Sequence, residues 1–136
     1  MKPIIRSIVL ATMILACTGV GSMAQSPADH EKQVKQMYEA IDKEIDRLTD
    51  LLELDDAQIF YVDSIMTHDY QAWQDELNEL NQKKVTNTDI YYQVQYKWQE
   101  QMYNSYQKVF TAEQWEKYLK SGAARAKKTR DKKMQK

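Results

Sequence analysis

The chain has 136 residues but contains only one cysteine, two prolines and three glycines. Beyond residue 24 no cysteine remains, and proline and glycine are reduced to Pro27 and Gly122. That segment therefore has no disulfide to stabilise it and no thiol nucleophile. It also has few devices for tight turns or strand bulges. These absences predict an all-helical fold that depends on side-chain packing.

The first two dozen residues have the pattern of an export signal. Lys2 and Arg6 precede an apolar run, Ser7 to Ala16, and small residues follow it up to Ala24. This order predicts a secretory signal peptide, residues 1–24, that is cleaved after Ala24. The apolar run is shorter than the ~20 residues that a membrane-spanning helix needs. We therefore expect an exported protein without a transmembrane span.

The segment Ile14-Leu15-Ala16-Cys17 offers a second interpretation, because it resembles a degraded bacterial lipobox. Leu15 fits that pattern poorly, and cleavage after Ala24 would remove Cys17 with the signal. Cleavage is the main prediction, and a lipid anchor on Cys17 is the alternative. In both cases we expect a periplasmic location.

Charge is distributed unevenly along the remaining chain. Residues 25–120 carry a formal net charge of −9, whereas residues 121–136 hold seven basic side chains and one acid, Asp131. The basic tail, residues 123–136, is expected either to extend a helix or to be disordered. It would attract acidic proteins or anionic envelope surfaces. Nucleic acid is not an expected partner, because an exported protein rarely meets it.

Apolar residues recur at steps of three and four through most of the chain, as on the buried face of a helix. Ser26 suits the N-cap of the first helix and Pro27 its first position. In the second predicted helix, which follows Asp55, we expect Tyr61, Ile65 and Tyr70 to lie beside the core face. The predicted core positions of the first three helices are Val34, Met37, Ile41, Ile45, Leu48, Leu52; Ile59, Val62, Met66, Trp73, Leu77, Leu80; and Ile90, Val94, Trp98, Met102, Tyr106, Val109.

The third of these segments is ambiguous, because residues 92–98 also alternate apolar and polar as a strand does. No other segment offers a partner strand, and a lone strand is not stable. We therefore predict a helix. A shorter fourth helix carries Trp115, Tyr118 and Leu119, and Gly122 is expected to end or weaken it. The prediction is one all-α domain, residues 25–122, built as a small antiparallel assembly of about four helices.

A short motif marks the start of the fourth helix. With Thr111 as N-cap, Gln114 is the N3 residue, and the two side chains can satisfy each other's backbone N–H groups as a capping box. Phe110 and Trp115 then occupy the two positions of a hydrophobic staple, which fixes the angle at which the chain enters the helix. The cap contributes about 1 kcal/mol.

The same motif occurs at the start of the second helix. Asp55 is the cap, Gln58 is the N3 residue, and Leu54 and Ile59 form the staple. A looser third version runs from Val85 to Ile90, with Asp89 in place of the glutamine. The two good copies predict helix starts near residues 55 and 111.

Paired boxes of this form in a small exported helical protein resemble the LTxxQ motifs of the Spy/CpxP family, over roughly residues 30 to 122. Two positions depart from the family pattern: Asp55 replaces threonine and Phe110 replaces leucine. The resemblance implies a helical hairpin or cradle, often dimeric, that acts in envelope stress. Family members are ATP-independent chaperones or inhibitors of a sensor kinase. The resemblance also implies a structural capping role for four residues: Asp55, Gln58, Thr111 and Gln114.

Residues suited to catalysis are sparse in the sequence. His30 and His68 each lack a second histidine at a ligand-like helical spacing. Neither Ser64 nor Ser105 has an evident histidine partner, and the single glycine beyond residue 24, Gly122, cannot form a phosphate-binding loop. We therefore predict no enzyme activity and no catalytic, cofactor or metal site.

Aromatic residues offer a candidate binding surface instead. Tyr92, Tyr96 and Tyr103 recur at steps of four and seven, and tyrosine combines a large apolar body with a polar tip. Such residues also often fill the rim of a helical core, so the stripe has two interpretations. The first functional hypothesis is a chaperone that shields exposed apolar segments of envelope proteins. The second is an adaptor or regulator that recognises one specific envelope partner.

Overall fold

The structure is a computed structural model that describes residues 26–135. The predicted signal peptide, residues 1–24, and Cys17 lie outside the described residues. Within them the chain is all-helical and contains no strand, as predicted. None of the helices in this part of the chain is long and apolar enough to cross a membrane.

Three long helices are followed by a run of shorter ones. The long helices are α1 (Pro27–Leu52), α2 (Asp56–Gln82) and α3 (Thr88–Val109). The run consists of α4 (Ala112–Tyr118), a π-helical segment (Leu119–Ala123) and α5 (Ala124–Met134). The basic tail that the sequence left undecided is therefore helical up to Met134.

Helix starts follow the local signals in the sequence. The Ser26 hydroxyl accepts a hydrogen bond from the Asp29 N–H, and Pro27 opens α1. At α3 the cap is Asn87, whose Oδ1 accepts from the Asp89 N–H at 3.0 Å. The looser motif implied Thr86 as the cap, so the helix begins one residue later than expected. Asparagine is a stronger N-cap than threonine. Despite its strand-like alternation, residues 92–98 are helical.

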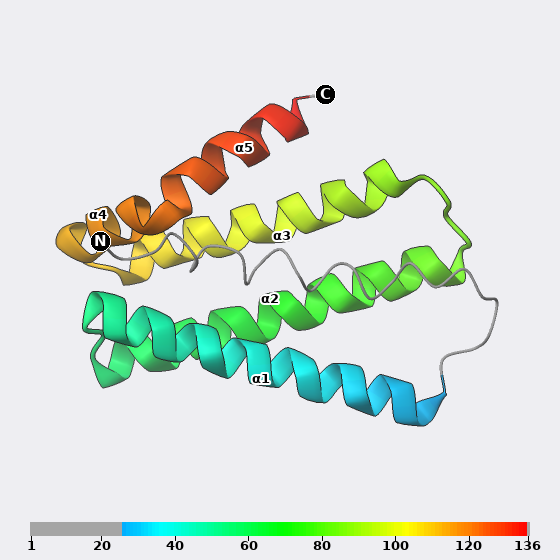
Figure 1. The fold of residues 1–136 in the computed structure, drawn as a ribbon, viewed down its shortest axis with the longest axis horizontal. Coiled ribbons are helices and arrows are strands. Elements are labelled where there is room, and N and C mark those ends of the chain that lie inside the picture. Colours follow the sequence, from blue (N-terminus) through cyan, green and yellow to red (C-terminus); the bar gives the residue numbers. More distant parts are fainter. Residues whose placement is uncertain (1–25, 136) are drawn as a thin grey trace, which may run out of the picture.

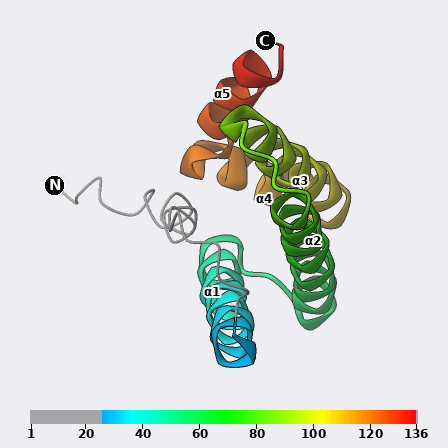
Figure 2. The same cartoon turned by 90° about the vertical axis from the view of Figure 1, so that its right-hand side faces the viewer.

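The three long helices run antiparallel, so the α1–α2 and α3–α4 turns meet at one end of the molecule (Figure 1). We call this the closed end, and the opposite end, where α1 begins and α2 turns into α3, the open end. Seen along the helices, α1 lies beside α2, α2 beside α3, and α5 beside α3 (Figure 2). The four helices form an arc with α1 and α5 at its two edges.

The hydrophobic core is concentrated toward the closed end. Its fully buried side chains include Ile41, Leu48, Leu52, Val62 and Met66, and α3 adds Met102 and Tyr106. Nearer the open end, Trp73 and Val94 are also buried. Ile90 was predicted to be a core residue but is 40% exposed, because it lies in the first turn of α3, beyond this cluster.

Gly122 interrupts the last helical run. Its φ of 121° lies in the region that only glycine adopts without strain, and it falls inside the π-helical segment between α4 and α5. The residue therefore neither ends the helix nor continues it regularly. It redirects the chain so that α5 lies along α3.

Candidate functional site

Both predicted capping boxes are present at the closed end. Asp55 Oδ1 accepts from the Gln58 N–H at 2.8 Å, and Gln58 Oε1 accepts from the Asp55 N–H at 3.1 Å. In the second box, Thr111 Oγ1 accepts from the Gln114 N–H at 3.2 Å, and Gln114 Oε1 accepts from the Thr111 N–H at 2.9 Å. The predicted helix starts at these two motifs are therefore confirmed.

The two boxes also bind each other, which the sequence did not predict. Gln58 Nε2 donates to Gln114 Oε1 at 2.7 Å, and Gln114 Nε2 donates back to Gln58 Oε1 at 3.1 Å. Each amide has one donor left, and each uses it on a carbonyl of the other hairpin. Gln58 Nε2 donates to the Val109 carbonyl and Gln114 Nε2 to the Leu52 carbonyl, both at 3.1 Å.

These bonds join four helix ends. Leu52 and Val109 are the last residues of α1 and α3, where carbonyls lack a partner within the helix. Each glutamine thus helps to cap the start of its own helix and the end of the helix before the other box. Both amides use their full capacity of two donated and two accepted bonds. The paired glutamines therefore join the α1–α2 turn to the α3–α4 turn at the closed end.

The predicted staple residues belong to the same core cluster. Leu54 and Phe110 are buried members of this cluster, and the partly buried Ile59 and Trp115 pack against the cluster. Phe110 stacks on Tyr106 with ring centroids 5.5 Å apart. Burial raises the pKa of Tyr106 well above its ordinary value. It also raises the pKa of Tyr118, the neighbouring aromatic, to about 12, with the nearby Glu44 carboxylate as the next cause.

The structure divides the predicted tyrosine stripe into two parts. Tyr92 is 46% exposed and stacks on the half-buried Tyr96, with ring centroids 6.4 Å apart. Tyr103 packs edge-on against Trp115 at 4.9 Å, and the cationic groups of Lys127 and Arg130 lie over its ring. Tyr92 and Tyr96 thus form an accessible pair, while Tyr103 joins the contact between α3 and the last two helices.

A second aromatic pair was not identified from the sequence. Phe60 and Tyr61 are 66% and 55% exposed, and their rings meet edge-on at 5.8 Å. Tyr61 was expected beside the core but instead lines an open hollow of about 450 Å³ with Gln58 and Lys108. Phe60 lies two positions before the buried Val62, hence on the opposite face of α2. That spacing is the signal that could have found it.

Neither histidine belongs to a cluster of metal-ligand side chains in the described part of the chain. His30 lines a hollow between α1 and α2 with Gln33 and Gln71. His68 contacts Asp69 Oδ1 through Nδ1 at 2.8 Å. Within residues 26–135, no group of three or more histidine, cysteine or acidic side chains is arranged to hold a metal ion.

Asp69 is the most buried acidic side chain among the described residues, at 3% exposure. Its Oδ1 accepts from Gln101 Nε2 at 3.0 Å. The other carboxylate oxygen and the buried indole N–H of Trp73 have no hydrogen-bond partner in the described part of the chain. A buried carboxylate that is only partly paired destabilises a fold.

Comparisons of the chain with protein families, curated proteins and solved structures found no match.

Proposed function

We propose that this protein is a non-catalytic helical chaperone of the bacterial envelope that binds exposed apolar segments of other proteins without ATP. The observation that carries the proposal is the stacked pair Tyr92–Tyr96, which presents aromatic surface on the side of a regular helix. Tyrosine suits such contacts because it is large and loses little conformational entropy on binding. A surface of this kind accepts varied apolar segments through many weak contacts.

Two further features support the same function. The interlocked capping boxes are the residues on which the resemblance to the Spy/CpxP family depends, and the arc of helices fits the cradle that this family implies (Figure 2). The predicted signal peptide would deliver the protein to the periplasm, where ATP is absent. Dimerisation remains an implication of the resemblance alone.

The proposal is tested by following the aggregation of two unrelated denatured proteins by light scattering. The full chain should suppress both near equimolar ratio without ATP. Tyr92→Ala with Tyr96→Ala should weaken suppression severalfold at unchanged helicity, since truncating an aromatic contact residue costs on the order of 1 kcal/mol, or about fivefold in affinity. The matched control is Phe60→Ala with Tyr61→Ala, which removes an aromatic pair elsewhere on the surface. Failure to suppress either aggregating protein would refute the chaperone function.

A second candidate function rests on the Phe60–Tyr61 pair. Among the described residues these two side chains are the most exposed of the large apolar ones, and Tyr61 lines the hollow at the closed end. A compact aromatic patch beside a hollow is typical of a docking site for one folded partner. In that case the protein is an adaptor or regulator, and it should not delay aggregation.

The adaptor function predicts a different response from the same two variants. Cross-linking in envelope extract should recover one stoichiometric partner. The Phe60/Tyr61 double variant should lose that partner and the Tyr92/Tyr96 variant should keep it. Recovery of many partners, or of the same partner with both variants, would count against an adaptor.

A further inference from the structure

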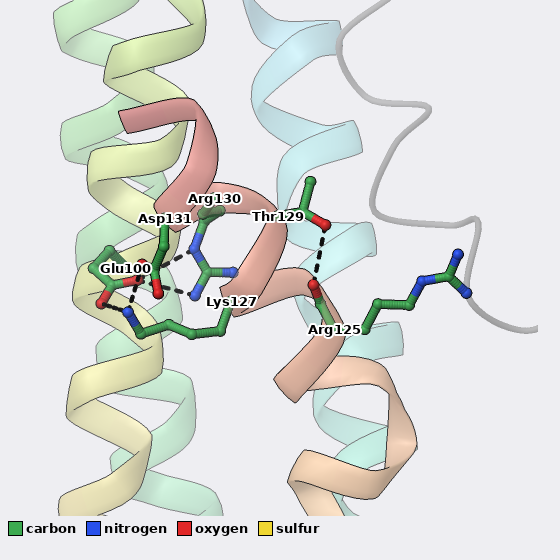
Figure 3. A network of polar contacts seen from close by, with 6 residues as sticks. All are labelled: Glu100, Arg125, Lys127, Thr129, Arg130 and Asp131. Atoms are coloured by element: carbon green, nitrogen blue, oxygen red, sulfur yellow. Dashed lines mark hydrogen bonds and ion pairs between the residues drawn. The ribbon is translucent and has the colours of Figure 1, made fainter. Parts of the chain in front are cut away.

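The cations of α5 are divided between two faces of the helix. Arg130 points toward α3, where its guanidinium nitrogens lie 3.2 and 3.3 Å from Glu100 Oε2 (Figure 3). Lys127 reaches Glu100 Oε1 at 2.9 Å and also binds Asp131 on its own helix. Hydrogen bonds to Asp131 and then to Glu100 raise the pKa of Lys127. These two cations hold α5 against α3.

The other face of α5 carries cations that take no part in this contact. Arg125, Lys128 and Lys132 follow one another at steps of three and four, so they share one face. Lys128 and Lys132 each lie two positions from the buried Arg130, which places them on the opposite side of the helix. All three are exposed, and none forms an ion pair with another described residue. Figure 3 shows the Arg125 side chain pointing away from Glu100.

This face contrasts with the rest of the molecule. α2 contains six acidic residues and no lysine or arginine, whereas α5 contains six basic residues and one acid. α5 also lies at an edge of the arc, on the side of α3 away from α1 (Figure 2). An anionic surface would repel the acidic body and attract this edge, so approach in one orientation is favoured.

We propose that the outward face of α5, formed by Arg125, Lys128 and Lys132, is a docking surface for an anionic phospholipid membrane. The three side chains are spread along one helix face and converge on no single acceptor position. That arrangement suits a layer of laterally mobile headgroups better than one fixed phosphate or one folded acidic protein. The surface is separate from both aromatic pairs and does not depend on the chaperone proposal.

The test is a sedimentation assay of the full chain with vesicles that contain or lack an anionic phospholipid. Affinity for anionic vesicles should fall as ionic strength rises. Replacing Arg125, Lys128 and Lys132 by alanine should weaken it by about fivefold per cation, or roughly hundredfold in all. Vesicles without anionic lipid report any contribution of the apolar segment Ser7–Ala16, which is the same in every variant.

A matched control separates the location of the charge from its amount. Lys32, Lys35 and Lys43 are exposed on α1, and their replacement by alanine removes the same net charge. That variant should keep most of the affinity, and circular dichroism should show unchanged helicity in both. Equal losses in the two variants, or equal binding to both kinds of vesicle, would overturn the proposal. So would binding to polyglutamate through the α5 cations without binding to vesicles.

Discussion

The side-chain amides of Gln58 and Gln114, 56 positions apart in the sequence, donate hydrogen bonds to each other in both directions. Each also binds a carbonyl at the end of a helix in the other hairpin. We expect Gln58→Ala and Gln114→Ala each to lower the free energy of unfolding by about 1–3 kcal/mol, because each leaves several partly buried polar groups unpaired.

A double-mutant cycle tests whether the two glutamines act as one unit. The double variant should lose less than the sum of the single losses, with a coupling of about 0.5–3 kcal/mol measured by urea unfolding. Gln107→Ala, at an exposed position of α3, is the control and should change stability by less than about 0.5 kcal/mol. Additive losses would show that the two boxes work separately.

Asp69 provides a prediction of opposite sign. One of its carboxylate oxygens has no partner in the described part of the chain, although the side chain is buried. Asp69→Asn keeps Oδ1 as an acceptor for Gln101 and a contact for His68, and it exchanges a buried charge for a neutral amide. A buried charge costs more than an unpaired amide N–H, so the change should raise the free energy of unfolding by on the order of 1 kcal/mol. Thermal unfolding measures the change. Asp63→Asn, at an exposed position of the same helix, should have little effect, and a loss of stability in Asp69→Asn would contradict the prediction.

Gly122 reverses the usual effect of a glycine-to-alanine change. In a regular helix the substitution stabilises by about 1 kcal/mol. At a φ of 121° alanine is strained, so Gly122→Ala should instead destabilise the protein by more than about 1 kcal/mol. Differential scanning calorimetry distinguishes the two signs. A rise in melting temperature would mean that the chain can run through this position as a continuous helix.

The lowered pKa of Glu76 predicts that the free energy of unfolding decreases as the solution becomes acidic. Burial alone would raise its pKa, but hydrogen bonds from Lys97 and Trp98 outweigh it and lower the pKa below the ordinary 4.5. A carboxyl with a lowered pKa in the folded state stabilises above its unfolded pKa, and this stabilisation is lost as pH falls through the folded value.

The group is partly exposed, so its contribution should be below about 1 kcal/mol. Urea unfolding between about pH 6 and about pH 3 should show a shallower loss of stability in Glu76→Gln than in the unmodified protein. Glu79→Gln serves as the control, because the one ion pair of Glu79 among the described residues is with Lys83, the C-cap of the same helix, and its side chain is far more exposed. Parallel pH profiles for Glu76→Gln and the unmodified protein would exclude the effect.

Features that depend on neighbouring residues in the sequence were predictable. The caps at Ser26, Asp55 and Thr111 lie where the sequence placed them, because an N-cap bond, and the capping box at Asp55 and at Thr111, is complete within four residues. The helical state of α3 was also predictable, since a strand would have had no partner. These signals determine helix starts and the absence of a sheet.

Features that depend on which helices pack together were not predictable. The mutual bonding of Gln58 and Gln114 requires the two hairpin ends to meet, and the local motifs contain no information about that meeting. The exposure of Tyr61 has the same origin, because helical periodicity locates an apolar face without showing how much of it a neighbouring helix covers. The division of the tyrosine stripe follows from the docking of α5 over Tyr103.

The hydrogen bonds between Gln58 and Gln114 hold α2 at the closed end, and this has a mechanical consequence for the open end. α2 has 27 residues and is therefore about 40 Å long. Its first turn is bonded to that of α4, so a tilt of the whole helix about this point produces its largest displacement at the open end. A tilt of about 5° at the closed end displaces the open end by about 3.5 Å at that length. A change in packing near Met66 or Met102 that tilts α2 by this amount would therefore alter the spacing of the helices most at the open end.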